Sequence, residues 1–77
     1  MRMQYGKLYQ YFDPDPFEER RMEGHFMVTT NNGWQAFSNS IVFVLLKKEK
    51  DHYVILLPDG ELGNLYTRAT RLKLAES

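Results

Sequence analysis

The feature that most constrains the fold of this sequence is a pair of apolar runs, residues 41–46 and 53–57, on either side of a charged segment, residues 47–51. The runs are rich in β-branched and aromatic residues, which favour strands. Neither alternates between apolar and polar residues, as a strand with one face in water would. We therefore expect the two runs to pair as a hairpin at the centre of a sheet, with a turn at residues 47–51.

Shorter strand patterns lie on both sides of this hairpin. The further predicted strands are residues 4–12, 24–30, 34–37 and 70–74. Asn31-Asn32-Gly33 predicts a hairpin turn of type I′, and Pro58-Asp59-Gly60 predicts a tight turn with proline at its first central position. Glycines and turn pairs at this spacing are typical of small all-β folds.

Helix signals are confined to residues 16–22. Asp15 is positioned to cap this segment and Pro16 to begin it, with acidic residues in the first turn. A segment of this length forms one or two turns and needs tertiary packing to be stable.

The length of 77 residues predicts one domain, spanning residues 1–77. Five or six short strands are too few for two large sheets, so we expect an antiparallel bent sheet that closes on itself as a small barrel. The chain has no cysteine, so neither disulfides nor thiolate ligands can stabilise it. Its own core or a partner surface must do so.

Composition narrows the classes of function. A formal net charge of zero argues against binding to nucleic acid or anionic membranes through overall charge. No apolar run approaches the ~20 residues that span a bilayer, and the first residues lack the apolar core of a signal peptide. We therefore expect a cytoplasmic protein that does not bind membranes; the lack of cysteine fits a reducing compartment.

Several segments resemble an SH3-like small β-barrel in their order along the chain. They are Leu8-Tyr9-Gln10-Tyr11, the acidic residues 13–23, Glu23-Gly24-His25-Phe26-Met27-Val28, Asn32-Gly33-Trp34 and Asp59-Gly60-Glu61-Leu62-Gly63-Asn64-Leu65-Tyr66. The resemblance implies a small barrel. The sequence departs from the family in its long apolar block, residues 41–57, and in lacking a Pro-x-x-Tyr segment after Gly63, where Tyr66 is the remaining aromatic residue.

Catalytic chemistry has little support in this sequence. His25 and His52 are the two histidines, each close to a carboxylate, an arrangement that can serve a general base or a metal ligand. Both are expected at solvent-facing positions, and no phosphate-binding loop or nucleophile motif accompanies them. We expect no enzyme activity, no catalytic or metal-binding residues and no cofactor.

Binding residues are better indicated. Tyr5, Tyr9 and Tyr11 share one face of the first predicted strand, with Lys7 among them. Such a stripe can grip a peptide or stack on nucleobases; alternatively, the tyrosines line the core with their hydroxyls at its rim. Trp34, directly after the Asn-Gly turn, is either a partly exposed binding anchor or a core residue.

The leading hypothesis is a small adaptor, inhibitor or accessory subunit that docks on a protein partner. It would use the aromatic stripe, Trp34 and an acidic loop whose carboxylates include Asp13, Asp15, Glu18 and Glu19. Such a loop would be attracted to a basic surface on the partner. Small phage and mobile-element proteins that block host machinery are often of this kind.

Two further hypotheses remain open. The first is a nucleic-acid-binding barrel that uses the tyrosine stripe together with Lys7, Arg68, Arg71 and Lys73. The second is a homodimer through the hairpin of residues 41–57, which applies if the sheet is too small to cover both apolar faces of that hairpin.

Overall fold

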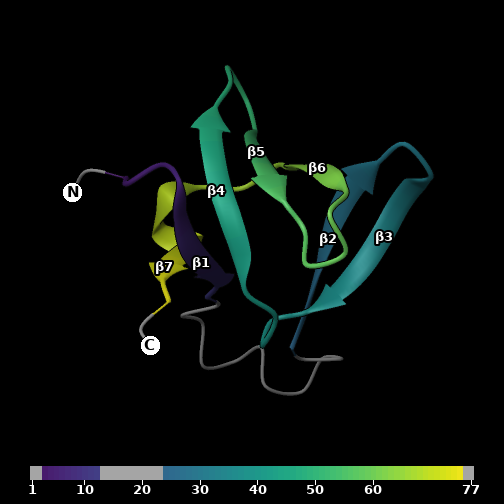
Figure 1. Ribbon diagram of the computed structural model, residues 1–77, viewed down its shortest axis with the longest axis horizontal. Helices are drawn as coiled ribbons and strands as arrows, with labels where there is room; N and C mark the ends of the chain where they lie inside the picture. The colour runs from purple at the N-terminus through teal and green to yellow at the C-terminus, as the bar shows by residue number, and fades with distance from the viewer. Residues whose placement is uncertain (1–2, 13–23, 76–77) are drawn as a thin grey trace.

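The computed structural model describes residues 3–12 and 24–75, which form one antiparallel sheet (Figure 1). Its strands are β1 (Lys7–Tyr11), β2 (His25–Thr30), β3 (Gly33–Ser38), β4 (Phe43–Lys48), β5 (Tyr53–Leu56), β6 (Leu62–Leu65) and β7 (Leu72–Leu74), and a short 3₁₀ helix, η2 (Ala69–Arg71), precedes β7. The helical turn predicted for residues 16–22 lies outside the described residues.

The two apolar runs form the β4–β5 hairpin at the centre of the sheet, as predicted. The strand order is β3-β2-β6-β5-β4-β1-β7, so β4 and β5 are paired on both sides. Leu45 lies opposite Ile55, and the register shifts by one residue between Leu45 and Lys47. In Figure 1, β1 and β7 lie on one side of this hairpin and β2 and β3 on the other.

The sheet is strongly bent, so its inner face encloses the core. The rings of Tyr11 on β1 and Phe26 on β2 stack with their centroids 5.0 Å apart, although three strands separate β1 from β2 in the sheet. Phe26 also lies 5.8 Å from the ring of Phe43. Among the described residues β3 and β7 end the sheet, which is therefore an open bent sheet.

The core is built by alternate residues of the strands. Phe43 and Leu45 on β4 and Tyr53 and Ile55 on β5 are buried, whereas the residues between them are half-buried. The other buried apolar side chains are Tyr9, Phe26, Val28, Leu57, Leu65 and Leu72. The face of the sheet opposite this core is called the outer face below.

The turn between β2 and β3 differs from the predicted type. Thr30 pairs with Gly33, so the hairpin lies where Asn31-Asn32-Gly33 predicted it. A type I′ turn needs positive φ at both central residues, but no non-glycine residue of the described part has positive φ, and Gly33 takes a φ of 94°. The prediction of type I′ is wrong because the glycine after the asparagine pair adopts the left-handed conformation instead.

Two differences concern the C-terminal third of the chain. Strand β6 was not predicted; it contains Gly63, whose missing side chain leaves space filled by Val28 and Leu57. The last strand is shorter than predicted, because residues 69–71 form η2. The sheet therefore has seven strands within the described residues, where the sequence predicts five or six. The described residues contain no helix that could cross a membrane.

Candidate binding surface

The outer face carries two rows of side chains that run across several strands. One row joins Leu8, Val44, Leu56 and Leu62, which are register partners on β1, β4, β5 and β6. The other joins Trp34, Thr29, Asn64 and Val54 on β3, β2, β6 and β5. Because the bend of the sheet turns these side chains away from the core, Leu8, Leu62 and Trp34 are exposed.

Trp34, Tyr66 and Met27 form an aromatic cluster at the β2–β3 end of this face. The side chain of Trp34 is 63% exposed, and its ring lies 6.2 Å from that of Tyr66, which is 50% exposed. Tyr66 also lies 5.0 Å from the imidazole of His52. Met27 on β2 is also exposed, and it lines the same hollow as Trp34 and Tyr66.

A hollow of about 290 Å³ adjoins the aromatic cluster. Its lining residues are Tyr11, His25, Phe26, Met27, Trp34 and Tyr66. Exposed aromatic side chains and a thioether around a hollow can bury an apolar side chain of another molecule. The aromatic cluster and this hollow are the candidate site.

The three tyrosines of the predicted stripe do not form one exposed surface. Tyr9 is 4% exposed and belongs to the core, and its hydroxyl oxygen accepts a hydrogen bond from the backbone N–H of Gln4 at 2.9 Å. Tyr11 is half-buried against Phe26, whereas Tyr5 is exposed. Tyr9, and in part Tyr11, therefore pack as the core alternative describes, whereas Tyr5 does not, and Leu8 and Phe12 face solvent.

The four cations of the nucleic-acid hypothesis lie at the β1–β7 side of the sheet. Lys7 is on β1 and Lys73 on β7. Arg68 directly precedes η2, and Arg71 is its last residue. The ammonium group of Lys73 lies 5.7 Å from the ring centroid of Phe12. Because Tyr9 is buried and Tyr11 half-buried, these cations do not stand beside an exposed stack of tyrosines.

A second hollow, of about 630 Å³, lies near the same side of the sheet. Gln4, Gly6, Lys7, Leu8, Val42, Leu74 and Ala75 line it. Its wall is mainly aliphatic, and it contains no aromatic side chain.

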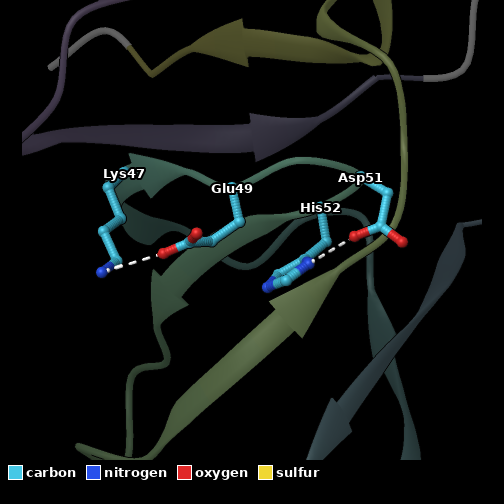
Figure 2. Close-up of polar contacts among 4 residues, drawn as sticks. All are labelled: Lys47, Glu49, Asp51 and His52. Atoms are coloured by element: carbon cyan, nitrogen blue, oxygen red, sulfur yellow. Dashed lines mark hydrogen bonds and ion pairs between the residues drawn. The ribbon is translucent and has the colours of Figure 1, made fainter.

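The end of β4 and the turn that follows it hold two polar pairs (Figure 2). The ammonium group of Lys47 lies 2.9 Å from a carboxylate oxygen of Glu49, and Nδ1 of His52 lies 2.9 Å from Oδ1 of Asp51. The hydrogen bond from Lys47 lowers the pKa of Glu49, and the hydrogen bond with His52 lowers the pKa of Asp51. Within residues 3–12 and 24–75, no three His, Asp or Glu side chains converge as a metal site.

The acidic residues of the predicted docking loop, Asp13, Asp15, Glu18 and Glu19, lie outside the described residues. Among the predicted binding residues that are described, Trp34 and Tyr5 are exposed. Met27 was not predicted as a binding residue. It alternates with Phe26 and Val28, so once those two are placed in the core the period of a strand places Met27 on the outer face.

Comparison of the chain with protein families, with curated proteins and with solved structures finds no match. The fold and the exposed residues are therefore the basis for any functional inference.

Proposed function

We propose that this chain is a non-catalytic protein-binding module and that the aromatic cluster of Trp34, Tyr66 and Met27 contacts the partner. The observation that carries the proposal is the exposure of Trp34, 63%, beside a second exposed aromatic ring at 6.2 Å. An indole ring left largely in water forgoes stabilisation that burial of a large aromatic side chain provides. Binding of a partner would recover it.

The cluster has the composition and the rigidity of a binding hot spot. Trp and Tyr are enriched among interface residues whose removal costs most binding free energy. They lose little conformational entropy on binding, since each has two side-chain torsions. Trp34 and Met27 project from paired strands, β3 and β2, so their backbone positions are held by the sheet before any partner binds.

The SH3-like resemblance and the acidic segment extend this proposal. In an SH3-like arrangement, Trp34 after the Gly33 turn and Tyr66 after β6 would form part of one groove on the barrel surface. Asp13, Asp15, Glu18 and Glu19 would then accelerate encounter with a basic surface on the partner through long-range attraction. We propose an adaptor, inhibitor or accessory subunit of this type.

Affinity capture with matched variants tests the proposal. The immobilised chain is incubated with an extract of its source, and retained proteins are identified by mass spectrometry. For a partner so identified, we expect Trp34→Ala to weaken binding by about tenfold or more, the effect typical of a hot-spot residue. Leu8→Ala is the control, because Leu8 is also exposed on the outer face but lies on β1, away from the cluster.

The role of the acidic segment is tested separately by reversing the charges of Glu18 and Glu19. Slower association, with a weaker dependence on salt, would support steering by the acidic segment.

The outcome that would overturn the proposed site concerns the first experiment: equal binding of the partner by the wild type, Trp34→Ala and Leu8→Ala.

A further inference from the structure

The two strands that end the sheet differ in how they are protected. An edge strand exposes unpaired N–H and C=O groups, and proteins usually blunt such edges with short strands, charged side chains, proline or bulges. β7 has three residues, contains Lys73 and directly follows Arg71. β3 has six residues, Gly33–Ser38, and contains neither a charged residue nor proline.

The lack of charge extends well beyond β3. All ten Lys and Arg and all ten Asp and Glu of the chain lie outside residues 26–46. The β2–β3 register is continuous from His25 opposite Ser38 to Thr30 opposite Gly33, without a shift that would mark a bulge between them. In the described part of the chain β3 pairs with β2 alone. β3 is thus a regular, uncharged edge of the kind that accepts another strand.

We infer that β3 pairs with β3 of a second copy of this chain, antiparallel and about a two-fold axis, so that the two sheets continue into each other. An unpaired edge accepts an extended strand, and β3 of a second copy is extended and brings no charge to the edge. Two-fold symmetry brings the same residues together from both copies, and no like charges meet across this boundary because β3 carries none.

The side chains of β3 fit such a pairing. Antiparallel partners directly opposite each other project to the same face of a sheet. The outer faces of the two copies therefore form one surface only in registers that place outer-face residues of one β3 opposite outer-face residues of the other. Two of these registers form the longest ladder. In one, residues 33–37 of one copy pair with residues 33–37 of the other; in the second, residues 34–38 pair with residues 34–38. They place Trp34 opposite Ala36 or Ser38 of the other copy, and both of these side chains are small. The large indole ring therefore meets no bulky residue opposite it.

This dimer differs from one formed through the hairpin of residues 41–57. That dimer would cover an apolar face of β4 and β5, whereas the present one extends the sheet at the free edge of β3; β4 is already paired with β1 and β5 with β6. The inference does not depend on the proposed function, since it rests on the backbone edge of β3, although Trp34 belongs both to β3 and to the aromatic cluster. The dimer would place the two copies of Trp34 on one continuous outer face.

Analytical ultracentrifugation of the full chain over a wide concentration range tests the inference. We expect the mass of the wild type to rise from that of a monomer to that of a dimer. Trp34, the chain's single tryptophan, should shift its emission to shorter wavelength over the same range, because its exposed ring becomes partly covered. A wild type that remains monomeric throughout would overturn the inference.

Charge variants at Ala36 locate the interface. Ala36→Lys places like charges near the two-fold axis, where they disfavour strand pairing, and we expect the dissociation constant to rise by about tenfold or more. A mixture of Ala36→Lys and Ala36→Glu should dimerise more tightly than either variant alone. Ala69→Lys, the same substitution at an exposed position of η2 near the opposite edge, is the control and should dimerise like the wild type.

Circular dichroism establishes that each variant is folded. If Ala36→Lys does not fold, Ala36→Gln and Ala36→Glu replace it. Their side chains are of similar length, but only that of Ala36→Glu is charged, so the pair still compares a neutral edge with a charged one. Dimerisation of the charged variants as tight as that of the wild type would assign the contact to another surface and overturn the inference. Hydrogen exchange gives a second test. If the chain is monomeric and the β3 amides become protected from exchange only when a different protein is bound, the inference is overturned as well.

Discussion

The rings of Tyr11 and Phe26 stack with an interplanar angle of 5° and centroids 5.0 Å apart, although β6, β5 and β4 lie between their strands in the sheet. This contact joins the N-terminal strand to the β2–β3 hairpin across the inner face. It places Tyr11 against the core and, by the alternation of a strand, turns Leu8 and Phe12 toward solvent. The bend of the sheet therefore decides which face of β1 is available to a partner.

The first prediction compares two phenylalanines on opposite faces. Phe26→Ala should lower the free energy of unfolding by about 3–5 kcal/mol, because it removes a buried ring and leaves a cavity. Phe12→Ala should lower it by less than about 1 kcal/mol, because Phe12 is exposed and its ring lies beside the ammonium group of Lys73. Urea denaturation followed by circular dichroism measures both. Losses of equal size would contradict the assignment of faces.

The second prediction concerns the glycine within β6. A Cβ atom added at Gly63 would collide with Cγ1 of Val28 and touch Leu57. Gly63→Ala should therefore destabilise the fold by about 1–3 kcal/mol, as overpacking of a core does. Val28→Ala removes the colliding atom at the cost of a cavity. The double variant should be more stable than the sum of the two single effects predicts, and strict additivity in this cycle would argue against close packing of Gly63 on Val28.

The same glycine shows why part of the fold could not be predicted from the sequence. Leu62-Gly63-Asn64-Leu65 has low strand propensity, since Gly and Asn are depleted in strands. It pairs as β6 because its neighbours β2 and β5 supply the ladder and Val28 fills the space above the glycine. The central hairpin was predictable because residues 41–46 and 53–57 are apolar whichever face is considered. Tertiary packing thus determines that residues 62–65 form a strand, whereas the local sequence is enough to predict the central hairpin.

The candidate site was predictable only in part, for a related reason. Trp34 stood out through its place after the turn, but both faces of β1 carry large apolar residues, so their alternation could not decide between Tyr9 and Leu8 for the core. The choice depends on how Tyr11 meets Phe26 across the bend, a contact between residues far apart in the sequence. Tyr66 joins the cluster only because β6 lies next to β2.

The third prediction is a dependence of stability on alkaline pH. Burial raises the pKa of Tyr53 above its ordinary value of about 10. The unfolded chain therefore releases this proton at lower pH than the folded chain does, and stability should fall as the pH rises through and above 10. Tyr53→Phe, which has no hydroxyl to ionise, should lose less stability between pH 9 and 11 than the wild type. This is measured by urea denaturation at each pH; identical pH profiles would contradict the burial of the Tyr53 hydroxyl.

The fourth prediction concerns the carboxylate at the β4–β5 turn. The hydrogen bond between Asp51 and His52 is the largest cause that lowers the pKa of Asp51 from its ordinary value of 3.8. A carboxyl whose pKa is lower in the folded state contributes stability above its unfolded pKa, and this contribution is lost as the pH falls through the folded value. NMR titration of the Asp51 side chain should therefore give a midpoint below 3.8 in the wild type and a higher one in His52→Ala.

Glu49 provides an internal reference for that titration. It lies in the same turn, and its pKa is lowered chiefly by Lys47, with His52 the last of its causes. His52→Ala should therefore shift the midpoint of Asp51 more than that of Glu49, whereas Lys47→Ala should do the reverse. Equal shifts of both carboxyls in His52→Ala would indicate a general change in the turn instead of the loss of one hydrogen bond. Because His52 also contacts the ring of Tyr66 at 5.0 Å, the same spectra should show whether this substitution moves Tyr66 within the aromatic cluster.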